Sequence, residues 1–181
     1  HHLLFEEGVV FPLNFLLQPS SNYALLFYAT MGTVIGLISV IVTKAVYWIE
    51  DVFEKLPIHW AWWPAIGGIA VGVVGFFAPR TLGVGYSNIT DLLTGTMPMQ
   101  VVLSLCVLKF LSWAISLGSG TSGGTLAPLL TIGGATGALI GSIGMFWFPN
   151  SGINIPLSVL VGMSAMFAGA SRAFLTSIVF A

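Results

Sequence analysis

The stretch Gly118-Ser119-Gly120-Thr121-Ser122-Gly123-Gly124-Thr125-Leu126-Ala127-Pro128 decides how this sequence is interpreted. None of its residues is charged, and all except Leu126 are small. An apolar segment at 129–148 follows at once. Glycine permits tight turns and close approach of the backbone to a ligand. Proline is favoured in the first turn of a helix. The stretch therefore predicts a loop that leads into the N-terminus of a helix.

A helix entrance of this kind is a candidate anion site. Unpaired backbone N–H groups collect there, and the helix macrodipole adds about half a positive charge. The hydroxyl groups of Ser119, Thr121, Ser122 and Thr125 are possible further donors. The residues alone leave two interpretations open, namely anion binding by the backbone and a glycine-rich break that only lets two helices cross.

The composition predicts an integral membrane protein. Of the 181 residues, 56% are hydrophobic and only 6% are charged, and the mean hydropathy is +0.99. A soluble domain carries about 25% charged residues, so this chain has too few charges to cover a surface that faces water. The net charge of -1 argues against nucleic acid as a partner. The single Cys106 offers no intramolecular disulfide or thiolate cluster, and we expect neither a metal nor a cofactor.

The apolar segments predict an all-α fold with discontinuous helices. A helix needs about 20 apolar residues to span a bilayer, and the segments expected to cross or enter the membrane are 24–43 (within a helix at 23–53), 64–78, 99–117, 127–148 and 156–170. A short amphipathic helix is expected at 86–93, and residues 1–21 resemble a connection at the membrane surface. Ser171-Arg172 separates the last span from a further helix at 173–181, a break typical of transporter sites.

Glycine spacing predicts tight helix packing. Gly133, Gly137 and Gly141 recur every four residues, and Gly68 and Gly72 form a second pair of this type. Small residues at this spacing let two membrane helices approach closely. We therefore expect close crossings along the segments 127–148 and 64–78.

The few charged residues give three candidates. Lys109 lies near the middle of a predicted span, where an ionisable residue is a functional suspect, although it can also snorkel or pair. Glu50 and Glu54 are interpreted either as a solvated helix end or as a proton relay. No His, Asp, Glu or Cys lies between Lys109 and Arg172. The glycine-rich loop therefore lacks a nearby catalytic partner, and we predict no catalytic residues and no enzyme activity.

The order of these motifs resembles the CLC family of chloride channels and chloride–proton antiporters. Gly124-Thr125-Leu126-Ala127-Pro128 is similar to the family's third anion-pathway motif, G-x-F-x-P, with Leu126 in place of the usual Phe. Residues 162–176 resemble the hairpin that often ends R-A-P-L-T, with Phe174 at the Pro position. Gly83-Val84-Gly85-Tyr86 resembles a further turn of the family.

The resemblance implies a site and a fold. Chloride would be held at the motif of Gly124, Thr125 and Leu126 by the backbone N–H groups of Thr125 and Leu126. The remaining residues of the anion pathway would be Gly118, Ser119, Gly120, Gly123, Ala127 and Pro128. The family fold is an inverted repeat of tightly packed helices, usually a homodimer. Residues 1–181 would be a partial transmembrane domain, much of the second half with both ends truncated. The gating glutamate and the central tyrosine of the family would lie outside it.

The expected function is chloride transport by a multi-pass protein of the lipid bilayer, and the residues leave both a channel and an antiporter open. Two alternatives differ in class. One is an intramembrane enzyme that acts on a lipid phosphate, and the other is a structural membrane scaffold.

Overall fold

The computed structural model describes residues 22–83, 85–149 and 151–180. Within these residues the chain is helical and contains no strand. In chain order the elements are α1 (Asn22–Glu54), η1 (Trp60–Trp62), α2 (Trp63–Phe77), η2 (Pro79–Thr81), α3 (Tyr86–Leu93), α4 (Met99–Gly118), α5 (Leu126–Trp147), α6 (Ile155–Ser171) and α7 (Phe174–Phe180). The surface connection expected at 1–21, and Val84 within the expected turn, lie outside the described residues.

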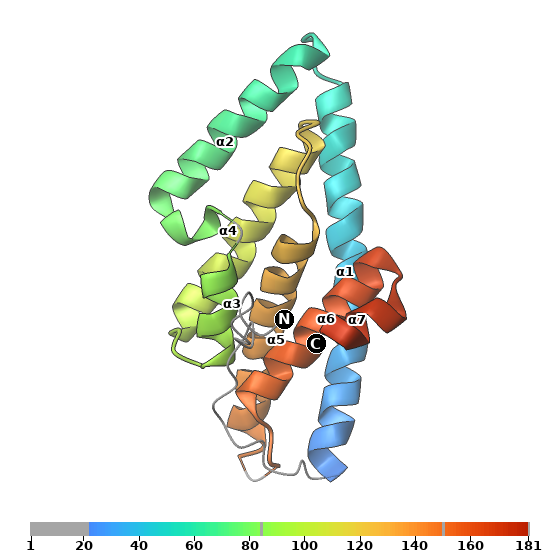
Figure 1. Cartoon of the computed structure of the whole chain (residues 1–181), viewed down its shortest axis with the longest axis vertical. Coiled ribbons are helices and arrows are strands. Elements are labelled where there is room, and N and C mark those ends of the chain that lie inside the picture. The colour runs from blue at the N-terminus through green and yellow to red at the C-terminus, as the bar shows by residue number, and fades with distance from the viewer. Residues whose placement is uncertain (1–21, 84, 150, 181) are drawn as a thin grey trace, which may run out of the picture.

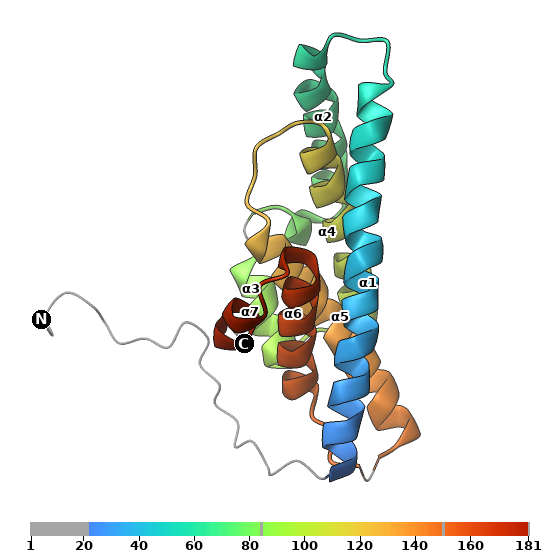
Figure 2. The ribbon, with the colours of Figure 1, turned by 90° about the vertical axis from the view of Figure 1, so that its right-hand side faces the viewer.

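The helices form an elongated bundle with α5 at its centre. Helix α1 runs along the whole length of the bundle (Figures 1 and 2). Helix α2 diverges from α1 and lies beside α4. Helix α5 packs most extensively against α6, and α6 also packs against α1. Two apolar clusters fill the spaces between these helices, one around Met31, Ile35 and Met166 and the other around Ile89 and Val159.

The crossing of α5 and α6 is as close as the glycine spacing predicts. A Cβ atom added to Gly133 would lie 2.6 Å from the carbonyl oxygen of Gly162. One added to Gly137 would overlap the carbonyl oxygen of Ser158, and one added to Gly141 would overlap the Ser158 side chain. The obstacles include backbone atoms, which cannot turn away as a side chain can. The prediction of a glycine stripe in this segment is therefore confirmed.

The prediction for α2 chose the wrong glycines. Gly68 and Gly72 are exposed, and a Cβ atom at either would meet nothing within 4 Å. The buried glycines of this helix are Gly67 and Gly75. Gly68 and Gly72 are four residues apart, but both lie on the side of α2 that faces away from α4 in this chain. Spacing alone does not tell which side of a helix is covered.

Most helix boundaries fall within one or two residues of their predicted positions. Helix α3 spans the expected residues, α4 ends one residue later than expected, and α5 begins one residue earlier. The predicted break between α6 and α7 is also present, and Arg172 adopts a left-handed backbone there, with φ of 59°. Among the described residues, four stretches are long and apolar enough to cross a membrane, namely Asn22–Glu54, Trp60–Phe77, Met99–Gly118 and Leu126–Trp147.

Candidate anion-binding site

Residues 119–125, here called the anion loop, connect the end of α4 to the start of α5. Figure 2 shows the loop as an open excursion between the two helices. Gly118 and Ser119 are buried, whereas residues 120–125 are exposed in this chain. The loop therefore has a packed beginning and an open remainder.

The beginning of the anion loop is fixed by backbone hydrogen bonds. The N–H groups of Ser119, Gly120 and Thr121 donate to carbonyl oxygens in the last turn of α4, at 2.9, 3.0 and 3.3 Å. Gly120 has φ of +77°, a left-handed conformation that glycine adopts without a steric penalty. This arrangement closes α4 with a glycine turn and sets the direction in which the chain leaves it.

The rest of the anion loop leaves its donors unused. Within the described part of the chain, none of the backbone N–H groups from Ser122 to Ala127 donates a hydrogen bond. Thr125 occupies the N-cap position of α5, but its hydroxyl accepts no capping bond from the helix. A serine or threonine at this position commonly provides such a cap. The entrance of α5 thus presents unpaired N–H groups at the positive end of the helix dipole.

The hydroxyl groups of the loop are not all free to act as donors. Ser119 is completely buried, and its hydroxyl donates to the carbonyl oxygen of Ser116 at 2.8 Å. The hydroxyl oxygen of Thr121 lies 3.1 Å from that of Ser119. The side chain of Ser119 therefore braces the start of the loop.

Lys109 is buried within the protein, with 4% of its surface exposed. Its Nζ donates to the carbonyl oxygens of Thr81 and Gly83, both at 2.8 Å. Pairing with backbone carbonyls is one of the usual ways in which a membrane helix carries a charge. Of the two interpretations of Lys109, the geometry supports pairing, because the amine holds the turn between α2 and α3.

Two cavities border the entrance of α5. One, of about 380 Å³, is lined by residues that include Glu50, Trp113, Thr125 and Ser171. The other, of about 180 Å³, is lined by residues that include Lys109 and Pro128. Ser171, at the break between α6 and α7, thus lines the same cavity as Thr125. The sequence predicted the break and the loop separately, and the fold brings them together.

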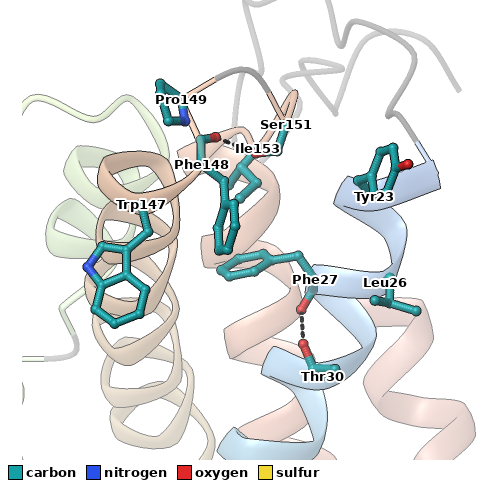
Figure 3. A pocket seen from close by; sticks show the side chains of 9 residues that line it. All are labelled: Tyr23, Leu26, Phe27, Thr30, Trp147, Phe148, Pro149, Ser151 and Ile153. Atoms are coloured by element: carbon teal, nitrogen blue, oxygen red, sulfur yellow. Dashed lines mark hydrogen bonds between the residues drawn. The ribbon is translucent and has the colours of Figure 1, made fainter.

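A larger cavity lies elsewhere. It has a volume of about 570 Å³ and lies between the start of α1 and the end of α5 (Figure 3). Aromatic and aliphatic side chains dominate its lining, which consists of Tyr23, Leu26, Phe27, Thr30, Trp147, Phe148, Pro149, Ser151 and Ile153. Since the anion loop adjoins the opposite end of α5, this cavity is not part of the candidate site.

Among the described residues, no group of three or more His, Cys, Asp and Glu residues is placed to hold a metal ion. The salt bridge between Arg80 and Asp91, at 3.0 Å, is exposed and joins η2 to α3. Neither finding tests the expectation that the protein binds no metal or cofactor, which stays a prediction.

Comparison with known proteins identifies the family. A family model described as "Voltage gated chloride channel" matches residues 1–181. Two similar relatives are the proteins named "Voltage-gated ClC-type chloride channel ClcB" of Escherichia coli O17:K52:H18 (strain UMN026 / ExPEC) and Escherichia coli (strain K12 / DH10B). Each is 31% identical over 153 residues, which cover 84% of this chain and 36% of the relative.

The chain thus spans about a third of the length of these curated relatives. Its four membrane-length helices agree with the family match, and the protein is an integral, multi-pass membrane protein. The resemblance identified from the loop at 118–128 is confirmed over the whole sequence. This chain belongs to the voltage-gated chloride channel family, the CLC family.

Proposed function

We propose that this chain forms part of a chloride pathway, in which the backbone N–H groups of Thr125 and Leu126 hold the permeating anion. The observation that carries the proposal is the run of unpaired N–H groups from Ser122 to Ala127 at the entrance of α5. Gly124 belongs to the same motif, and its lack of a side chain leaves room for an ion to approach the backbone.

The physical chemistry of conduction favours such a site. A permeating ion must be bound strongly enough to enter and weakly enough to leave. The anion loop contains no charged residue, so it offers partial charges and hydrogen bonds in place of a full positive charge. Leu126 has an aliphatic side chain where the family usually has a ring, but the proposed contact uses its backbone N–H and does not depend on that ring.

The assembly is part of the same proposal. The relatives from Escherichia coli are named chloride channels, and this chain aligns with about a third of their length. We infer that the complete protein transports chloride across a lipid bilayer as a homodimer, and that it is a transporter or channel and not an enzyme. No specific observation favours a phosphate-processing enzyme or a structural scaffold.

The location of the site is tested with bromide, which scatters X-rays anomalously and replaces chloride. Crystals of the complete protein that carries this chain are soaked in bromide. We expect an anomalous peak within hydrogen-bond distance of the N–H groups of Thr125 and Leu126. Bromide peaks that all lie away from α5, in a protein that transports chloride, would contradict the assigned site.

The role of the N–H groups is tested by halide flux from liposomes that contain the complete protein. Thr125→Pro removes one N–H group, whereas the control Leu126→Phe changes a side chain and keeps its N–H. A hydrogen bond to a charged partner is worth about 1.5–3 kcal/mol, and each 1.4 kcal/mol is a tenfold change in affinity. We therefore expect the apparent chloride affinity, taken from the dependence of the flux on chloride concentration, to weaken at least about tenfold in Thr125→Pro and to change little in Leu126→Phe.

The same flux assay separates the two modes of transport. Proton movement coupled to chloride flux would indicate an antiporter, and chloride flux without it would indicate a channel. A complete protein that moves no chloride under any proton gradient would refute the proposed function.

A further inference from the structure

We propose that Gly67 is a positioning residue for the anion loop, because its missing side chain lets α2 enclose Ser119 where the loop leaves α4. The inference rests on the proposed function of the loop and adds a residue from a different helix to it. No residue of α2 belongs to the anion-pathway motif.

The contact between α2 and the loop leaves no room for a larger residue. A Cβ atom added to Gly67 would overlap the hydroxyl of Ser119 and would lie 2.6 Å from its Cβ atom. The next nearest atom, the carbonyl oxygen of Ile115, would be 3.6 Å away, which is an ordinary contact. The conflict is therefore with Ser119 alone.

Ser119 has little freedom to move away. Its side chain is completely buried, and its hydroxyl donates to the carbonyl oxygen of Ser116. Its backbone N–H donates to the carbonyl oxygen of Ile115 at 2.9 Å. A methyl group at position 67 would have to displace α2 or rotate Ser119 out of these bonds. Either change moves the point from which the loop departs.

Helix α1 closes the other side of the same point. A Cβ atom added to Gly118 would lie 2.6 Å from Cγ2 of Ile49 and 3.1 Å from the backbone nitrogen of Glu50. Figure 1 shows the end of α4 lying between α1 and α2. The start of the loop is thus held between two helices, with a glycine on each side.

The position of the start matters because the rest of the loop is not held by its own hydrogen bonds. The N–H groups from Ser122 to Ala127 are unpaired in the described part of the chain. Their location depends on the two ends of the loop, at Ser119 and at the first turn of α5. Displacing Ser119 therefore alters the geometry that the anion meets.

Gly68 provides a matched control. It is the next residue of the same helix, it is exposed, and a Cβ atom there would meet nothing within 4 Å. Gly67→Ala and Gly68→Ala make the same change in helix propensity, so a difference between them reports on the contact with Ser119.

The experiment uses the complete protein that carries this chain, reconstituted in liposomes, and measures both the chloride flux and the ratio of chloride to nitrate flux. We expect Gly67→Ala to lower the flux by about tenfold and to shift the ratio, and Gly68→Ala to keep both. A purely structural glycine would change the amount of folded protein without changing the ratio.

A second-site change tests the contact directly. Ser119→Gly removes both atoms that conflict with a Cβ at position 67, so Gly67→Ala combined with Ser119→Gly should return to the flux and ratio of Ser119→Gly alone. Ser119→Ala keeps its own Cβ atom 2.6 Å from the added one and should not rescue Gly67→Ala.

The outcomes separate this inference from the proposed function. A wild-type protein without chloride flux would refute the proposed function. A wild-type protein that conducts, with Gly67→Ala equal to Gly68→Ala in flux and ratio, would overturn the role of Gly67 alone. If Gly67→Ala does not fold, the variant that combines it with Ser119→Gly decides, because recovery supports the contact and failure to recover overturns it.

Discussion

Replacing Lys109 with methionine should destabilise the protein by about 2–4 kcal/mol. Methionine keeps an apolar stem of similar length but cannot donate to the carbonyl oxygens of Thr81 and Gly83, both 2.8 Å from Nζ. A hydrogen bond from a charged donor contributes about 1.5–3 kcal/mol. Thr81 is buried, so its carbonyl oxygen is left without a partner, and the carbonyl oxygen of Gly83 loses its bond as well. Removing the desolvated charge offsets part of the loss.

The assay is the free energy of unfolding of the complete protein, measured by denaturant titration in detergent. Lys44→Met is the control, because Lys44 is exposed on α1 and its loss should change the free energy by less than about 0.5 kcal/mol. A Lys109→Met protein as stable as the control would refute the pairing role. If that variant also lost chloride selectivity, the interpretation of Lys109 as part of the ion path would regain support.

Two further predictions concern packing. Gly137→Ala should cost at least about 1–3 kcal/mol of unfolding free energy, because the added methyl meets the backbone of Ser158, whereas Gly36→Ala, which meets nothing within 4 Å, should not destabilise. Equal stability of the two variants would contradict the close crossing of α5 and α6. Tyr28→Phe should lower the free energy of unfolding by about 1–2 kcal/mol in the same titration, because the N–H of Asn154 loses its hydrogen bond of 2.8 Å to the tyrosine hydroxyl. An unchanged midpoint of the denaturant titration would count against that bond.

Local chemistry made the helices predictable. Pro98 occupies the N-cap position of α4, and Met99 is the first residue of that helix. Gly120 supplies the left-handed residue that closes the same helix. The break at Arg172 follows a run of small residues, and the entrance of α5 follows a run of glycine, serine and threonine. Such signals act over a few residues, so the order and the ends of the helices could be predicted from the sequence.

Partners that are distant in the chain could not be predicted in the same way. Lys109 pairs with carbonyl groups more than twenty residues away, and nothing in the sequence around it names them. Gly67 and Gly68 are identical neighbours, yet one is covered by Ser119 and the other is exposed. The difference depends on how α2 lies against α4, which is a property of the assembled bundle. Sequence spacing therefore selected the wrong pair of glycines in α2.

A site made of backbone N–H groups depends on packing in a way that a lysine or arginine site does not. A long charged side chain can follow a displaced anion by rotating about its own bonds, whereas a backbone N–H moves only when its loop moves. The one buried lysine in the described residues is engaged with carbonyl groups, and the anion loop has no charge of its own. Its affinity must then come from geometry, and the residues that set the geometry are those at its packed beginning. This is why a glycine on a helix outside the motif is expected to affect which anion passes.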